Sequence, residues 1–144
     1  MDAHFTAPGE GLPGRRALKA SGEQTRGAYA VAEGMSPVEG TPLHVHEREE
    51  EAWFVLEGEI IFKVGDSKFT APAGSFVIAP RGIAHAHKSA GPTPARFIAI
   101  VSPPGFEGFF GEQMKLRAAG AASEDFSALA ARYGIKELGP ADWS

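Results

Sequence analysis

The apolar residues of this chain fall in runs of only four to eight residues, separated by glycine, proline, aspartate or serine. Runs of this length suit β-strands, because helices need about ten residues or more. Short strands bounded by turn residues are typical of antiparallel sandwiches and barrels. The sequence therefore predicts a single all-β domain of roughly eight or more antiparallel strands. The runs lie between Ala17 and Val101 and read GAYAVAEG, PLHVH, EAWFVLEG, EIIFKVG, KFTA, SFVIAP, IAHAHKS and ARFIAIV.

The two ends of the chain have a different character. Residues 1–14 are rich in proline and glycine and show no periodicity, so we expect an N-terminal arm that is mobile or laid over the surface. Residues 15–103 form the predicted barrel. Residues 104–144 are expected to form a helical extension, because apolar residues recur there at helical spacing.

Two short helices are predicted within this extension. The first has Phe106, Phe109, Phe110 and Met114 on one face. The second is expected to begin at Ser123 as N-cap and to end at Gly134 as C-cap, with Phe126, Leu129, Ala130 and Tyr133 on one face. Such faces most often pack against a core, so these helices cap the barrel, or the first of them forms a wall of a pocket mouth.

Composition excludes several classes of protein. The 144 residues include no cysteine, so disulfides, thiolate zinc sites, iron–sulfur clusters and cysteine nucleophiles are ruled out. The formal net charge is -4, and no basic cluster is long enough to follow a phosphate backbone, which argues against nucleic acid as a partner. No apolar run approaches the roughly 20 residues that span a bilayer, and the first residues lack a signal-peptide core. We expect a cytoplasmic protein that does not bind membranes.

The run from Ala52 to Leu56 is apolar without alternation. A strand of this kind has both faces covered, one by the barrel interior and the other by a second layer. A second copy of the chain is a plausible cover, so we expect a homodimer.

Four of the five histidines form two His-x-His pairs, His44 with His46 and His85 with His87. Residues i and i+2 of a strand share one face about 7 Å apart, so two imidazoles can converge on one ion with bonds near 2 Å. Both pairs lie in strand-like runs. The pairs therefore indicate a metal site inside the barrel.

Glu51 is the carboxylate that the strand pattern directs toward these histidines. It has the same phase as Trp53 and Val55, so it faces the interior if they do. A buried carboxylate needs a partner, and a divalent cation is the natural one. The other charged residues of this stretch, Glu47, Arg48 and Glu49, are expected to form a solvated turn.

These residues resemble the two motifs of the cupin superfamily. GTPLHVHEREEEAWFVLEG matches the first motif through His44, His46, Glu51 and Gly58, and GSFVIAPRGIAH matches the second through Gly74, Pro80, Gly82 and His85. The resemblance implies a jelly-roll β-barrel in which His44, His46, Glu51 and His85 bind one divalent metal. The chain departs from the family at Val38, where a glycine is frequent, and at Ser89, where an asparagine is frequent. Neither position is a ligand in the family.

Three further residues are candidates for the surroundings of the metal. His87 shares the face of His85, so it is a hydrogen-bond partner behind the ligands, a substrate contact or an interior filler. Trp53 and Phe62 are more simply explained as core residues, although a small barrel offers few other walls for an aromatic ligand.

The ligand set also limits the chemistry. Three neutral imidazoles and one carboxylate leave a divalent ion with a charge of +1 and, in octahedral geometry, two open positions for an anion and dioxygen. Glu51 would act as ligand or, when detached, as catalytic base. Iron, nickel, manganese or cobalt would permit dioxygenase chemistry on a small aromatic or enolisable substrate, whereas zinc would permit only Lewis-acid reactions.

The segments SPPGFEGFF and FSALAARYGIKELGP are similar to those of small bacterial quercetinase-like cupins, which implies a dioxygenase. Similar cupins act as polyketide cyclases, which implies instead a redox-inert zinc cyclase or isomerase. A third alternative is a non-enzymatic cupin that binds a small molecule. Because one fold hosts many chemistries, this step is by analogy.

Overall fold

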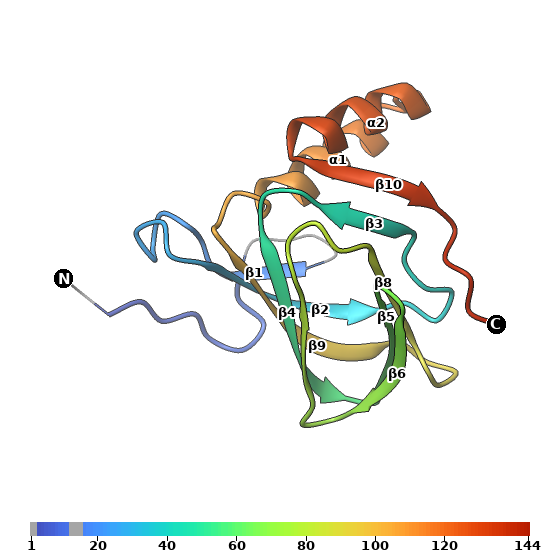
Figure 1. Cartoon of the computed structure of the whole chain (residues 1–144). Helices are drawn as coiled ribbons and strands as arrows, with labels where there is room; N and C mark the ends of the chain where they lie inside the picture. Colours follow the sequence, from blue (N-terminus) through green and yellow to red (C-terminus); the bar gives the residue numbers. More distant parts are fainter. Residues whose placement is uncertain (1–2, 12–15) are drawn as a thin grey trace.

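The computed structural model describes residues 3–11 and 16–144. Its strands form two five-stranded antiparallel sheets that face each other (Figure 1). One sheet has the order β1-β2-β9-β4-β7 and the other the order β10-β3-β8-β5-β6. This arrangement confirms the predicted jelly-roll barrel. The strands are β1 Arg16–Ala20, β2 Ala30–Ser36, β3 Leu43–His46, β4 Glu50–Glu57, β5 Glu59–Val64, β6 Ser67–Pro72, β7 Phe76–Ala79, β8 His85–Ser89, β9 Ala95–Ser102 and β10 Ile135–Gly139.

The barrel interior is filled by every second residue of the strands. In β9 the inward side chains alternate with half-exposed ones, and those that face in are Ala95, Phe97, Ala99 and Val101. Large side chains such as Trp53, Phe62 and Phe97 are each only 1% exposed. Burying one aromatic or branched side chain contributes about 1.5–3 kcal/mol, so these residues fix which face of each strand points inward.

Each of the eight predicted runs contains a strand, from β2 to β9. Two strands were not predicted. β1 extends the first sheet beyond β2, and β10 lies within the segment expected to be a helical extension. Its sequence IKELG has little alternation. It pairs with β3 because Gly134, with φ +69°, ends the preceding helix directly before the strand.

Both predicted helices are present, as α1 Gly108–Ala118 and α2 Ser123–Arg132. They cover the end of the barrel where β3 and β10 lie (Figure 1). The predicted N-cap is wrong by one residue, because Ala122 occupies that position and Asp125 accepts a hydrogen bond from its N–H. The expected apolar faces pack together in a second core cluster, which contains Phe106, Phe109, Leu129, Ala130 and Ile135.

The strand β4 is covered on its inner face but not fully on its outer face. Ala52, Trp53 and Val55 are buried, whereas Phe54 is 41% exposed. Its neighbours on β7, Phe76 and Ile78, are 54% and 47% exposed. The outer face of this sheet therefore carries a group of large apolar side chains that one chain leaves open to solvent.

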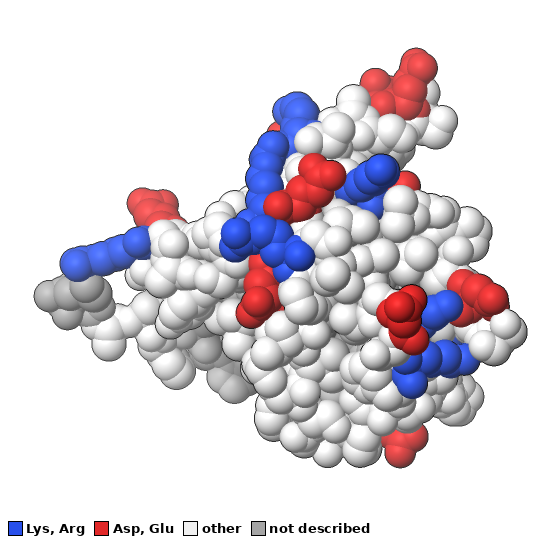
Figure 2. All heavy atoms as spheres, in the orientation of Figure 1, with Lys and Arg blue, Asp and Glu red and all other residues white. Residues whose placement is uncertain are grey.

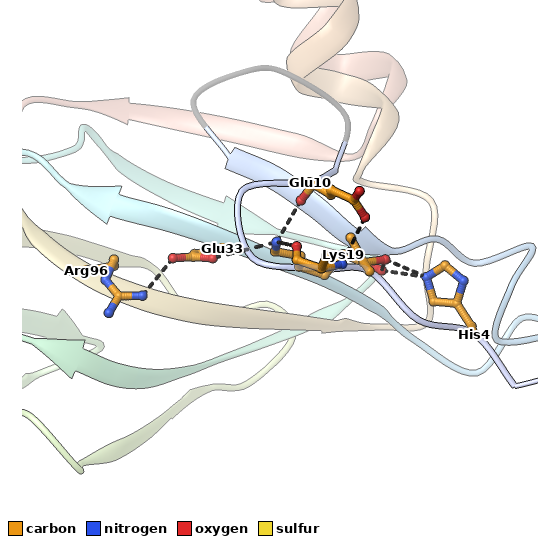
Figure 3. Close-up of polar contacts among 7 residues, drawn as sticks. His4, Glu10, Lys19, Glu33 and Arg96 are labelled. Atoms are coloured by element: carbon orange, nitrogen blue, oxygen red, sulfur yellow. Dashed lines mark hydrogen bonds and ion pairs between the residues drawn. The ribbon is translucent and has the colours of Figure 1, made fainter.

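The described part of the N-terminal arm, residues 3–11, lies along β1 (Figure 3). The ammonium of Lys19 donates hydrogen bonds to the carbonyls of Ala7 and Glu10 at 3.1 and 2.6 Å, and His4 donates to the carbonyl of Lys19 at 2.8 Å. The same Lys19 approaches Glu33, which pairs with Arg96 at 2.8 Å. This part of the arm is thus laid over the sheet, while residues 1–2 and 12–14 of the predicted arm lie outside the described residues.

On the face shown in Figure 2, Lys and Arg side chains lie beside Asp and Glu side chains. Neither α1 nor α2 combines the length and apolar character needed to cross a bilayer, and no other helix occurs in the described ranges.

Candidate metal centre

The four predicted ligands meet at one place inside the barrel. His44 and His46 project from β3, His85 begins β8, and Glu51 lies near the start of β4 in the opposite sheet. The register places His44 opposite His85. One ligand atom from each of the four residues can be chosen so that all lie within 4.8 Å of one another.

The separations suit a single ion. The carboxylate Oε2 of Glu51 lies 3.3 Å from Nε2 of His46 and 3.5 Å from Nε2 of His85. With bonds of about 2.1 Å, adjacent ligand atoms lie about 3 Å apart and opposed ones about 4.2 Å apart. The observed spacing is that of a slightly open coordination shell.

The outer nitrogen of each histidine is held by an acceptor. Nδ1 of His44 donates to the carbonyl of Pro42 at 2.8 Å, and Nδ1 of His85 donates to the carbonyl of Ile83 at 3.0 Å. Nδ1 of His46 bonds to the carboxylate of Glu49 at 2.6 Å. A carbonyl only accepts, so the proton is on Nδ1 and the lone pair of Nε2 is left for a ligand. All three imidazoles are therefore in the tautomer that metal binding requires.

Two inner nitrogens of the site have no hydrogen-bond partner among the described residues. Nε2 of His46 and Nε2 of His85 are buried and accept no hydrogen bond. Glu51 is only 1% exposed beside them. Buried acceptors and a buried carboxylate are costly unless a cation compensates them, so this donor set fits a divalent metal ion.

His44 is held in its neutral form by its surroundings. Burial, together with the neighbouring His85 and His46, lowers the pKa of His44 to about 4 from the usual 6.5. Below that pH a proton would compete with the metal for Nε2, and above it the ring is free to bind.

Glu49 is buried, so the prediction that it lies in a solvated turn is wrong. It was expected in a solvated turn with Glu47 and Arg48, and those two residues are exposed. Glu49 is instead 4% exposed, because its side chain turns inward to hold His46. A carboxylate behind a ligating histidine fixes the ring and raises its basicity, so Glu49 would support a bound metal through His46.

The three further candidates lie deeper in the barrel. His87 is buried, and its Nδ1 lies 2.7 Å from the hydroxyl of Ser36, which is fully buried. Trp53 and Phe62 belong to the core cluster, with their rings 5.7 and 5.8 Å from that of His87. Of the three, His87 lines the pocket that contains the metal ligands, whereas Trp53 and Phe62 lie behind it.

A pocket of about 260 Å³ opens from the ligands toward the helices. Its apolar wall includes Phe97, Met35 and three phenylalanines from the start of α1 and the turn before it. Phe106 of this group packs edge-on against the ring of His46 at 4.6 Å. The pocket confirms that α1 forms a wall of the mouth, as well as capping the barrel. Polar side chains of the wall are Thr41, Gln113, Arg117 and Glu137.

Four residues of the site were not predicted from the sequence, namely Glu49, Ser36, Gln113 and Arg117. The spacing of Glu49, three residues after His46, was a usable signal, because a tight turn brings such a carboxylate back to the ring. The polar Ser36 in an otherwise apolar strand was a second one. The two residues of α1 offered no signal, since their position depends on how the helix docks.

Part of the chain is similar to a known protein family. A family model described as a cupin domain matches residues 32–101, which include all four ligands. A search of curated proteins gives no match.

Several solved structures share the fold. A conserved protein with a double-stranded β-helix domain from Klebsiella pneumoniae is 24% identical, with a TM-score of 0.53 over 70% of this chain and 84% of that one. A predicted oxalate decarboxylase from Thermotoga maritima is 27% identical, with a TM-score of 0.52 over 60% of this chain and 76% of that one. KdgF from a Halomonas species is 18% identical, with a TM-score of 0.60 over 73% of this chain and 98% of that one.

The contact between His46 and Glu49 yields a first prediction. Glu49→Gln keeps the shape of the side chain but removes its charge, so we expect the affinity for zinc or cobalt to fall about tenfold. Competition with a chromophoric chelator measures this affinity. Glu47→Gln is the matched control, because Glu47 is exposed and two residues away. Equal affinities in the two variants would show that Glu49 does not support the metal.

The lowered pKa of His44 yields a second prediction. The unfolded chain takes up a proton at His44 near pH 6.5 and the folded chain only near pH 4. Between these values the unfolded state binds more protons, so the free energy of unfolding of the metal-free protein falls as the pH falls. We expect a loss on the order of 2 kcal/mol from about pH 7 to about pH 4.5 that is absent in His44→Gln. Urea unfolding measures it, and identical pH slopes in the two proteins would contradict it.

Proposed function

We propose that this chain, whose residues 32–101 match a family model described as a cupin domain, is a metal-dependent dioxygenase of the quercetinase-like type. Its substrate in this proposal is a small aromatic or enolisable molecule. The observation that carries the proposal is the set of three imidazoles and one carboxylate at an aromatic-walled pocket. A bound iron, nickel, manganese or cobalt ion would supply the redox chemistry that oxygen requires.

The residues of the chain would then bind and deprotonate the substrate. Phe106, Phe109 and Phe110 provide an apolar surface for a flat ring. Glu51 is proposed as the catalytic residue, because it lines the pocket and its carboxylate, when detached from the metal, can accept the proton of an enol or phenol. His87 is proposed as a substrate contact from the opposite wall, with its ring fixed by Ser36.

The comparisons support metal chemistry on a small oxygen-rich molecule. The structure from Thermotoga maritima is titled a predicted oxalate decarboxylase, and it is 27% identical to this chain. Oxalate binds through oxygen atoms, as the proposed substrates do.

A zinc polyketide cyclase or isomerase is the second candidate. The same four ligands suit zinc, which forms bonds of about 2 Å to histidine and carboxylate. Such an enzyme would need Glu51 for proton transfer but would not consume oxygen. A cupin that only binds a small molecule is the third candidate, and the buried proton acceptor in the pocket argues against it.

Oxygen consumption separates these candidates. The protein is loaded in turn with iron, nickel, cobalt, manganese and zinc and is supplied with flavonols and β-diketones under air. We expect substrate-dependent oxygen uptake with at least one of the first four metals and none with zinc. Glu51→Gln should lower the rate by about a hundredfold or more, as expected for a lost general base.

Glu50→Gln is the control for that variant, because Glu50 is exposed and adjacent in the chain. Turnover that continues without oxygen in the zinc form would contradict the dioxygenase and support the cyclase.

We also propose that two copies associate through the outer face of β4 and β7. Phe54, Phe76 and Ile78 are large, exposed and adjacent on these strands. A two-fold axis through this face would bury the same group from both chains, as symmetric dimers do.

Sedimentation should therefore give twice the chain mass of 15.2 kDa. Ile78→Lys should give the mass of one chain, because a charge in the centre of an apolar interface is not solvated. Phe69→Lys is the control, since Phe69 is 40% exposed but belongs to the other sheet. A single-chain mass for the unmodified protein would overturn the proposal.

A further inference from the structure

The side of α1 that faces the metal pocket changes its chemistry along its length. Phe106, Phe109 and Phe110 line the pocket at the start of the helix, followed by Gln113 and then Arg117. These positions recur every three to four residues, so they form one helical face. The pocket wall is therefore apolar at one end and cationic at the other.

Arg117 has no ion-pair partner in the part of the chain that the structure describes. Among the described residues, no carboxylate lies within the 4.0 Å of an ion pair with its guanidinium. Some other arginines are engaged, since Arg96 binds Glu33 and Glu57 and Arg48 donates to the carbonyl of Arg132. Arg26 and Arg81 have no ion pair among the described residues either, but they do not line the pocket. Arg117 lies in the last turn of α1, where the carbonyl ends of the helix favour a positive charge.

The wall of the pocket carries two charges of opposite sign. Outside the ligand set, the charged residues of its wall are Arg117 on α1 and Glu137 on β10. Glu137 pairs in register with His44 on β3. An anionic group of a bound molecule is thus attracted toward α1 and repelled from β10.

We propose that Arg117, assisted by Gln113, binds a carboxylate of the substrate. This inference rests on the proposed function and names its substrate class: an aromatic or enolisable acid whose carboxylate lies at the end opposite its metal-binding oxygens. The guanidinium presents two parallel N–H groups that match the two oxygens of a carboxylate. The amide of Gln113, one helical turn earlier, offers a further donor on the same face.

A pair of probes isolates the carboxylate. Catechol and 3,4-dihydroxybenzoate offer the same two oxygens to a metal, and only the second carries a carboxylate at the far side of the ring. Both are titrated into the cobalt-loaded protein, and the visible absorption of cobalt reports binding without any turnover. The measured quantity is the affinity for 3,4-dihydroxybenzoate divided by the affinity for catechol.

We expect Arg117→Gln to lower this ratio five- to tenfold, as for a partly exposed charge-assisted contact. The cobalt content and the affinity for catechol should not change. Lys115→Gln is the matched control, because it removes a positive charge from the same turn at a position that does not line the pocket. Glu137→Gln should change the ratio in the opposite direction, raising it two- to threefold.

An unchanged ratio in Arg117→Gln, or an equal fall in Lys115→Gln, would overturn the role of Arg117. Failure of the unmodified protein to bind cobalt or catechol would overturn both this inference and the proposed function. If the ratio falls in Arg117→Gln as expected but the protein never consumes oxygen, the dioxygenase proposal is wrong and the carboxylate site stands.

Discussion

The structure depends on one electrostatic constraint, the burial of the Glu51 carboxylate beside three imidazoles. An unpaired carboxylate in this position would cost several kcal/mol. The imidazoles cannot offset it by donating hydrogen bonds, because their protons are on Nδ1 and are directed outward to Pro42, Glu49 and Ile83. A divalent cation satisfies the carboxylate and the three lone pairs together. The chemistry of the site and the stability of its surroundings therefore have the same origin.

This constraint also joins the two sheets. His44, His46 and His85 belong to one sheet, and Glu51 belongs to the other. An ion bound by all four would link the layers at the end of the barrel where the core is interrupted by polar groups. Because the four side chains come together only in the folded chain, the free energy of metal binding adds to the free energy of folding.

Much of this arrangement was predictable from the sequence because it follows from the period of a β-strand. Alternation placed His44 with His46 and Glu51 with Trp53, and turn residues gave β2 to β9. The missed features depend on tertiary contacts instead. Glu49 is buried because a turn returns it to His46, although its neighbours Glu47 and Arg48 are solvated as expected. The pairing of β10 with β3 requires that α2 ends at the correct position, which no local pattern in IKELG records.

The barrel carries the residues proposed to bind the metal and react, and the C-terminal extension carries those proposed to select the substrate. The ligands come from β3, β4 and β8, which are fixed by paired strands on either side. The pocket wall beyond the ligands includes residues of α1 and β10, which pack on the barrel through a separate core cluster around Phe106, Leu129 and Ile135. In the proposed function, changes at Gln113 or Arg117 would adapt the pocket to another acid and leave the strands that carry the four ligands unaltered. Because the ligands and the rest of the pocket wall come from separate parts of the chain, the ligand motifs in the sequence indicate the class of reaction more closely than they indicate the substrate.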